Sequence, residues 1–138
     1  MAINFPNSPT LNEEFQSGNT TWKWNGTVWL KIAETDIPEV ELRTSNPYTL
    51  ILSDAEKYLR FSDTSQFDVT VPAESTSNFT TGSIITIEQR NTGRVKVLPA
   101  SGVTLNYYGG QYTAGQYAIV QIIKVGTDTW TLIGGTAL

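Results

Sequence analysis

The C-terminal two thirds of the sequence are a succession of short, apolar, β-branched segments, each followed by a few turn-forming residues. From Tyr48 onward, Gly, Pro, Asn, Asp and Ser separate these segments at regular intervals. Such spacing is typical of all-β sandwiches and barrels. The pattern therefore predicts an all-β domain over residues 48–138, an eight-strand β-sandwich with a jelly-roll-like topology. The eight predicted strands are YTLIL, KYLRF, FDVTV, SIITIEQR, RVKVL, VTLNY, YAIVQIIKV and TWTLI.

A second constraint lies near the N-terminus, where three tryptophans occur within eight positions. The segment TTWKWNGTVWLKI contains two alternating runs joined by an Asn-Gly pair at positions 25–26. This is the strongest short-range signal for a two-residue type I′ hairpin. The turn would place Trp24 opposite Thr27 and Trp22 opposite Trp29, with all three indoles on one face.

The remaining N-terminal residues suggest an arm and a linker. Residues 1–18 contain two prolines among Asn, Ser and Gly, show no periodicity, and are expected to form an extended arm. Phe5 and Phe15 are the large aromatic anchors of this arm. Residues 34–47 are acidic, contain two prolines and are predicted to be a linker. The expected organisation is an anchoring module at 1–33, a linker at 34–47 and a β-sandwich at 48–138.

The tryptophan face is too apolar to remain in water. Each indole could bury roughly 150–250 Å², an upper bound of about 4–6 kcal/mol. A two-stranded hairpin is marginally stable by itself. The aromatic face must therefore lie against the chain's own β domain, another subunit or a larger partner. The sequence leaves these three open. The predicted assembly interface consists of Phe5, Phe15, Trp22, Trp24 and Trp29.

Composition excludes several function classes. The chain has neither histidine nor cysteine, which removes the usual general base near neutral pH, thiolate chemistry and most transition-metal sites. We therefore expect no enzyme activity and no cofactor. A net charge of −4 without a basic cluster argues against nucleic acid as a partner. No apolar run is long enough to cross a membrane, and the first residues lack a signal-peptide pattern.

Two pairs of acidic residues could be imagined as a calcium site or a glycosidase pair. They are Asp54 with Glu56 and Asp63 with Asp68. All four residues lie in turn-forming clusters, where Asp and Ser side chains commonly bond to their own backbone. Solvated turn residues are therefore the favoured interpretation, and no metal site is predicted.

The segment YYGGQY combines three tyrosines with two glycines. Tyrosine rings can stack on sugar faces, and glycines let a backbone approach a ligand closely. Tyr107, Tyr108 and Tyr112 are therefore a possible glycan-binding platform. The alternative is a hairpin loop whose tyrosines close one end of the sandwich.

The N-terminal segment also resembles a short module found near the ends of fibre and other virion proteins of tailed bacteriophages, especially cyanophages. The module reads Phe-Pro-x-Ser-Pro, an aromatic residue, and then Thr-Trp-x-Trp-Asn/Asp-Gly-x-x-Trp. Residues 48–135 are similar to a β domain of phage fibre and decoration proteins, most clearly at FTTGSIITIEQRNTGRVKVLPASGVTLN. The module occurs once here rather than in tandem. Its matching positions are Phe5, Pro6, Ser8, Pro9, Phe15, Trp22, Trp24, Gly26 and Trp29.

This resemblance implies a phage structural protein that acts by binding, as a capsid decoration or head-fibre subunit. It also implies a homotrimer, contact with the major capsid protein or a tail component, and a place on the virion surface after synthesis in the host bacterial cytoplasm. A carbohydrate-binding module of a tail fibre, which would recognise a host glycan, is the alternative.

Overall fold

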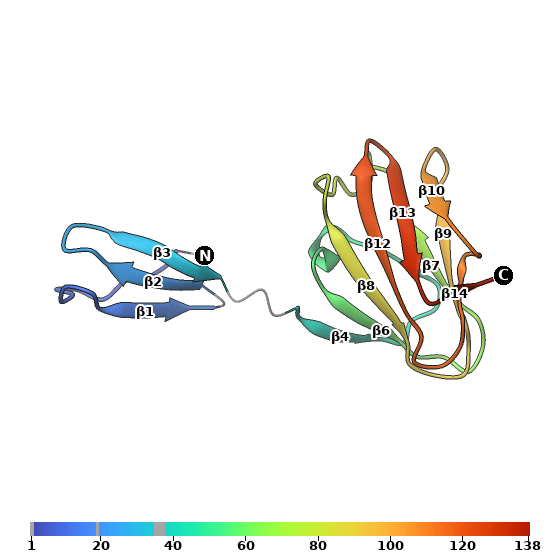
Figure 1. The fold of residues 1–138 in the computed structure, drawn as a ribbon, viewed down its shortest axis with the longest axis horizontal. Coiled ribbons are helices and arrows are strands. Elements are labelled where there is room, and N and C mark those ends of the chain that lie inside the picture. The colour runs from blue at the N-terminus through green and yellow to red at the C-terminus, as the bar shows by residue number, and fades with distance from the viewer. Residues whose placement is uncertain (1, 19, 35–37) are drawn as a thin grey trace. The chain divides into compact units, whose positions relative to one another are not determined.

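The computed structural model describes residues 2–18, 20–34 and 38–138, and it confirms that the chain is all-β. The chain divides into two compact units, Met1–Ile37 and Pro38–Leu138 (Figure 1). Each unit has its own sheets and its own packed side chains, so each is described by itself.

The first unit is a three-stranded antiparallel sheet. Its strands are β1 (Glu14–Ser17), β2 (Thr20–Trp24) and β3 (Trp29–Glu34), in the order β1-β2-β3. The expected hairpin is therefore present as β2 and β3. The expected extended arm is in part a strand of the sheet, because four of its residues form β1 and pair with β2.

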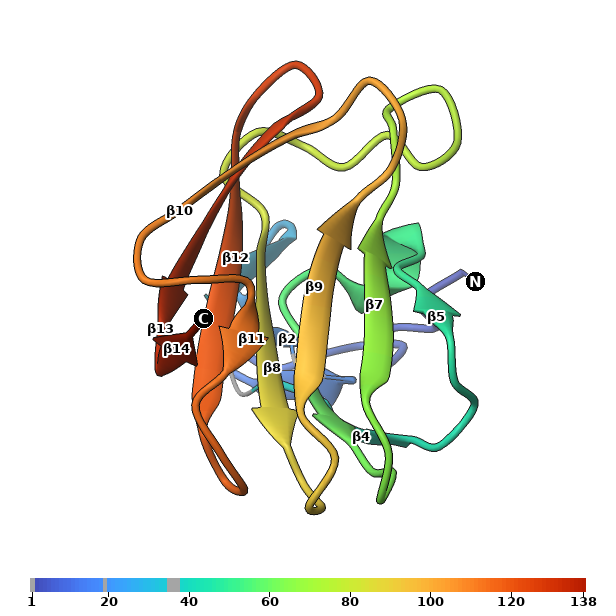
Figure 2. The same ribbon diagram turned by 90° about the vertical axis from the view of Figure 1, so that its right-hand side faces the viewer.

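The second unit consists of two sheets that face each other. Figure 2 shows β7 and β9 in one sheet, with β8 and β12 of the other sheet behind them. One 3₁₀ turn, η1 (Leu52–Asp54), lies between β5 and β6. In spatial order, the six-stranded sheet contains β10 (Thr104–Tyr107), β13 (Thr129–Gly134), β12 (Ile119–Gly126), β8 (Ile84–Gln89), β6 (Tyr58–Phe61) and β4 (Val40–Arg43). The five-stranded sheet contains β14 (Thr136–Ala137), β11 (Tyr112–Thr113), β9 (Val95–Pro99), β7 (Phe67–Val71) and β5 (Tyr48–Thr49).

The strand directions differ from those of a jelly roll. The chain alternates between the two sheets, and β4, β6 and β8 are parallel neighbours in one while β5, β7 and β9 are parallel neighbours in the other. The first half of the unit is thus a coil in which each turn adds one strand to each sheet. A jelly roll would require antiparallel Greek keys. Antiparallel pairing begins only with β11 and β12, which fold back onto β9 and β8.

Alternating side chains from both sheets fill the space between them. Phe61 and Phe67 meet edge to face, with ring centroids 5.0 Å apart, and Trp130 meets Phe79 in the same way at 5.3 Å. The alternation of buried and less buried residues along β7 and β12 follows the two-residue period of a strand. The apolar core comprises Leu50, Leu59, Phe61, Phe67, Val69, Val71, Phe79, Ile85, Ile87, Val95, Val97, Val103, Leu105, Val120, Ile122, Trp130 and Leu132.

One buried cation fastens the segment between β7 and β8 to the core. The side chain of Lys124 on β12 is 2% exposed. Its Nζ donates to the backbone oxygen of Phe79 over 2.6 Å and forms an ion pair with Glu74. A buried ammonium needs such partners because desolvation without them is costly. Lys124 therefore holds this loop to β12.

Strand β4 lies inside the range 34–47 that the sequence suggested as a linker. Residues 35–37 of that range lie outside the described residues, whereas residues 40–43 pair with β6 as the edge strand of the six-stranded sheet. Glu41 is opposite Leu59 and Arg43 is opposite Phe61, so the two charged side chains share the inward face. Val40 and Leu42 face outward instead. This reversed alternation and the prolines at positions 38 and 47 made the segment look like a linker.

Successive turns of the coil stack closely at one corner. The N–H of Gly93 donates to the backbone oxygen of Asp63 over 2.9 Å. A Cβ at position 93 would lie 1.8 Å from the backbone oxygen of Ser65. The turn between β8 and β9 can therefore rest on the turn between β6 and β7 only because residue 93 has no side chain.

Replacement of Gly93 by alanine should push these two corners apart and destabilise the β domain by about 1–3 kcal/mol, the usual cost of overpacking. Gly115→Ala is the matched control, because a Cβ at that position would meet nothing within 4 Å. Urea unfolding measures both effects. Equal stabilities of the two variants would contradict the stacking argument.

Candidate functional site

The three tryptophans share one face of the first unit, but in a different register from the one expected. Trp24 is opposite Trp29, Lys23 is opposite Leu30 and Trp22 is opposite Lys31. An irregularity between Thr21 and Trp22 shifts the pairing farther along the strands. The predicted pairing of Trp24 with Thr27 and of Trp22 with Trp29 is therefore wrong.

The connecting loop explains the difference. Residues 25–28 lie between the two strands, and the side-chain oxygen of Asn25 accepts hydrogen bonds from the backbone N–H groups of Thr27 and Val28 over 2.9 and 2.8 Å. Gly26 has a φ of +97°, which suits glycine. The asparagine thus organises a four-residue loop through its own side chain. The loop is therefore two residues longer than the two-residue turn expected from the Asn-Gly pair.

The aromatic residues of the arm cover the tryptophan face. The ring of Phe5 stacks on Trp29 with centroids 5.4 Å apart and an interplanar angle of 12°. It also meets Trp22 edge to face at 5.2 Å and lies 5.5 Å from Phe15. Trp24 completes the group through Trp29 at 5.7 Å. We call Phe5, Phe15, Trp22, Trp24 and Trp29 the aromatic cluster.

The aromatic cluster gives the first unit a core of its own. The sequence suggested the β domain, another subunit or a larger partner as cover for the tryptophan face, and it did not suggest the arm. Contact between Phe5 and the strands depends on the path of the chain between them, which the sequence pattern does not reveal. All five rings remain half-buried, so they also present apolar surface to solvent. Trp22 Nε1 is buried without a hydrogen-bond partner among the described residues. The role of these residues in assembly stays a prediction.

The opposite face of this sheet is mixed, because β3 contributes aliphatic side chains whereas β1 and β2 contribute Glu14 and Lys23. Val28 is 49% exposed and lies in the loop, and Leu30 and Ile32 on β3 are 48% and 49% exposed. The first unit therefore has one aromatic face covered by the arm and an opposite face, called the aliphatic face for its exposed Val28, Leu30 and Ile32.

The structure does not bring the three candidate glycan-binding tyrosines together. Tyr107 ends β10 in the six-stranded sheet, whereas Tyr112 begins β11 in the five-stranded sheet. Arg94 and Lys96 lie 4.6 and 5.1 Å from the centroid of the Tyr112 ring, which is thus engaged in cation–π contacts. Tyr108 is 95% exposed. Tyr107 and Tyr108 remain available to a ligand, and Tyr112 supports the sheet.

The tyrosine loop is held firmly at its base. Thr136 Oγ1 donates to the backbone oxygen of Tyr108 over 3.0 Å. A Cβ on Gly110 would lie 2.0 Å from the backbone oxygen of Ala137, so glycine allows the loop to approach β14. The two exposed tyrosines are therefore displayed on a preorganised turn.

Two of the four acidic candidates, Glu56 and Asp63, lie in turns or loops as expected, whereas Asp68 lies on β7. Asp63 accepts from the N–H of Ser65 over 2.9 Å, and this backbone bond holds the pKa of the Asp63 carboxyl below its usual value. Glu56 accepts from the N–H of Ile84, and Asp68 from the side-chain amide of Gln66. Among the described residues, no group of three or more acidic side chains could hold a metal ion.

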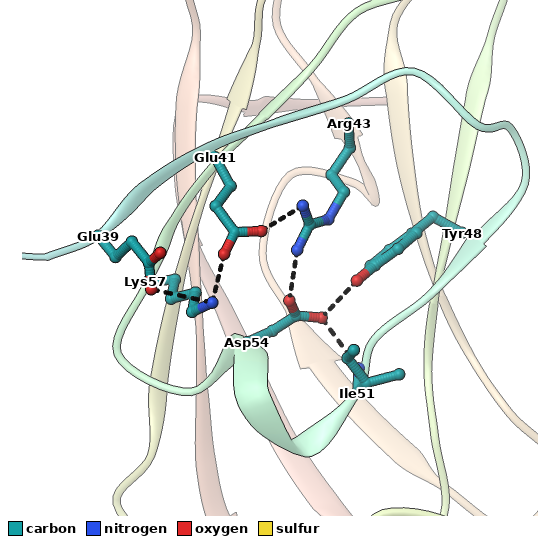
Figure 3. A network of polar contacts seen from close by, with 7 residues as sticks. All are labelled: Glu39, Glu41, Arg43, Tyr48, Ile51, Asp54 and Lys57. Carbon is teal, nitrogen blue, oxygen red and sulfur yellow. Dashed lines mark hydrogen bonds and ion pairs between the residues drawn. The ribbon is translucent and has the colours of Figure 1, made fainter.

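Asp54 differs from this expectation, since its side chain is fully buried. Its carboxylate accepts from Arg43 Nη2 over 3.0 Å, from the Tyr48 hydroxyl over 2.9 Å and from the N–H of Ile51 over 2.9 Å (Figure 3). Burial and the bond to Asp54 raise the pKa of the Tyr48 hydroxyl. The interpretation of Asp54 as a solvated turn residue is wrong, because the inward-facing Arg43 brings a guanidinium to it.

The network around Asp54 extends along β4 to Lys57. Glu41 forms ion pairs with both Arg43 and Lys57, and Lys57 Nζ also lies 3.0 Å from Glu39 Oε2 (Figure 3). The bond from Lys57 keeps the pKa of the Glu41 carboxyl below its usual value. The network places charged side chains where the core would otherwise end in open apolar surface. We call Glu39, Glu41, Arg43, Tyr48, Asp54 and Lys57 the end cap.

Comparisons with known proteins do not place the chain in a family. No protein-family model matches the sequence, and a search of curated proteins finds no matching relative. Within the part of the chain that the structure describes, no helix is long and apolar enough to cross a membrane. Function must therefore be argued from the aromatic cluster, the tyrosine loop and the surface of the β domain.

Removal of the buried carboxylate should weaken the end cap. Asp54→Ala leaves Arg43 and the Tyr48 hydroxyl without their shared acceptor, and we expect a loss of about 3 kcal/mol in the free energy of unfolding. Asp68→Ala, an acidic residue with one local partner, should change stability by less than about 0.5 kcal/mol. Chemical denaturation of both variants gives the comparison. A small effect at Asp54 would show that the end cap is dispensable.

Truncation of Trp22 should unfold the first unit alone. The Trp22→Ala change removes a ring in contact with Phe5, at a cost of about 2–3 kcal/mol because the site is half-buried. A three-stranded sheet of this size has little stability to lose. Near-UV circular dichroism should lose the signal of the aromatic cluster, while the buried Trp130 keeps its native fluorescence. Simultaneous unfolding of both units would contradict their independence.

Proposed function

We propose that this chain is a structural subunit of a tailed-phage virion, acting by binding and assembly rather than catalysis, as a capsid decoration or head-fibre protein. The main support is that the aromatic residues carrying the resemblance form one cluster within one compact unit. Phe5 is in ring contact with both Trp22 and Trp29 although it is far from them in sequence. The motif thus has a physical meaning as a self-contained module.

The module is suited to attachment. Its rings are half-buried, so one set of side chains both holds the unit together and offers aromatic surface to a partner. Aromatic residues, tryptophan above all, dominate the energetics of protein interfaces. We propose that the partner is the major capsid protein or a tail component. The β domain then projects from the particle, and several copies associate, with a trimer as the proposed state.

The β domain fits a role without catalysis. Its buried charged groups serve the fold, since Asp54 binds Arg43 and Lys124 binds Glu74. The coil and its end cap supply a well-packed body for display outside the particle.

A second candidate function is recognition of a host glycan by the tyrosine loop of a tail fibre. It is favoured by the exposure of Tyr108 and by the firm base of its loop, because a preorganised aromatic surface loses little entropy when a sugar ring stacks on it. Tyr107 would share this platform, whereas Tyr112 would support it from the sheet.

Attachment can be tested with Trp24→Ala, which removes the ring at the margin of the aromatic cluster. We expect about 2–4 kcal/mol weaker binding to virions that lack the protein, roughly 30- to 1,000-fold in affinity. Co-sedimentation with particles measures the binding. Ile32→Ala, on the aliphatic face of the same sheet, is the matched control and should bind normally.

The same set of proteins separates the two functions. Wild-type protein that never binds particles, or equal binding by the two variants, would contradict attachment through the aromatic cluster. Binding to an immobilised glycan that disappears in Tyr108→Ala and survives in Trp24→Ala would support the second candidate instead.

A further inference from the structure

The outer face of the six-stranded sheet is unusually apolar. On β4, Val40 and Leu42 are 60% and 58% exposed, and Ile119 on β12 and Ile133 on β13 are 45% and 43% exposed. Ile84 on β8 is paired directly with Ile123 on β12, and both are half-buried on the same outer face. Aliphatic side chains thus lie on β4, β8, β12 and β13 of this face, and the outward Tyr58 and Arg60 of β6 lie between those of β4 and β8. We call this surface the aliphatic sheet face.

The five-stranded sheet has a different outer surface. Asp68 and Thr70 face outward on β7 and Lys96 faces outward on β9, with Leu98 as an aliphatic exception. One side of the β domain is therefore polar and the other apolar. Strand β12 is apolar on both faces along most of its length, as is typical of a strand that is covered on both sides.

The charges of the aliphatic sheet face are balanced internally. Along its described strands, the outward charged side chains are Arg60 and Glu88, and Arg60 Nη2 lies 3.0 Å from Glu88 Oε1. The Tyr58 hydroxyl donates to Glu88 over 2.7 Å. Burial alone would raise the pKa of Glu88, but the bonds from Arg60 and Tyr58 keep it below its usual value. The outward charges on these strands thus cancel, whereas the chain as a whole has a net charge of −4.

We propose that the aliphatic sheet face is the contact surface for a second copy of this chain. Two copies carry the same net negative charge, and they meet with least repulsion where each is neutral. A flat sheet face can also pack on an identical face about 10 Å away, with each copy offering the same residues to the other. The inference rests on the self-association part of the proposed function and assigns it to the β domain. Because a contact between identical faces joins two copies, it predicts a dimer in place of the trimer.

The size of the face approaches what a specific contact needs. Five strands spaced about 4.8 Å apart, each about 18 Å long, outline roughly 450 Å² in flat projection. The relief of the side chains raises the accessible area above this value, toward the roughly 600 Å² per partner at which stable interfaces begin. Burial of Val40, Leu42, Ile119 and Ile133 from two copies supplies the apolar area of such an interface.

Sedimentation velocity on the full chain tests this assignment. We expect wild-type protein to associate as its concentration rises, and Ile119→Lys to weaken the association at least about tenfold, because it places like charges opposite each other. Leu98→Lys, which puts the same charge on the outer face of the other sheet, is the matched control and should associate normally. Circular dichroism shows that each variant is folded.

A second measurement does not depend on a disruptive substitution. The chain has no cysteine, so Gln121→Cys places a single thiol near the middle of the aliphatic sheet face. A short bis-maleimide should link two such chains at concentrations where the protein associates. The corresponding Thr70→Cys variant, on the polar side, should remain unlinked.

Several results would overturn the inference. They are a wild-type chain that sediments as one copy at every concentration, association that is unchanged in Ile119→Lys, or crosslinking at position 70 instead of 121. If the wild-type chain never self-associates and Ile119→Lys loses virion binding, the face would instead contact another virion protein. Failure of Trp24→Ala to affect virion binding would refute attachment by the aromatic cluster while leaving the self-contact intact.

Discussion

The buried contact between Asp54 and Arg43 allows the coil of the β domain to end. In a parallel coil, the inward side chains of each strand pack beside those of the coil turn before it. The first strand has no earlier turn beside it, so its inward side chains are left uncovered on that side. Here β4 turns Glu41 and Arg43 toward that position, and Asp54 and Lys57 neutralise them. Inward charges on an edge strand also discourage another strand from pairing there. The end cap therefore closes the core and protects the edge with the same residues.

The two units solve the problem of a small core in different ways. The β domain has enough strands to bury aliphatic side chains between two sheets. The first unit has three short strands, so it relies on a few large rings and on an arm that returns over them. Most of the apolar contact within this unit is made by the aromatic cluster. A unit stabilised in this manner depends on each ring, and Phe5 contacts Phe15, Trp22 and Trp29.

Much of this architecture could be predicted from the sequence, but its connections could not. Strand spacing after Tyr48 indicated the all-β class, and alternation around Trp24 and Trp29 indicated the hairpin. Strand direction was missed because a two-residue period is the same in parallel and antiparallel sheets. The loop at Asn25 was misjudged by two residues because its side chain bonds to the backbone. The burial of Asp54 was missed because its partner, Arg43, lies in a strand whose apolar residues face outward.

The position of β4 gives the end cap a mechanical role. Tension applied to the first unit would enter the β domain at Pro38 and load β4 before any other strand. Hydrogen bonds from Tyr58 to the oxygen of Glu39 and from Ser62 to the oxygen of Arg43 restrain the two ends of that strand. The ion pair with Asp54 ties it sideways to η1. The charged side chains of the end cap thus also transmit force from β4 to the rest of the domain.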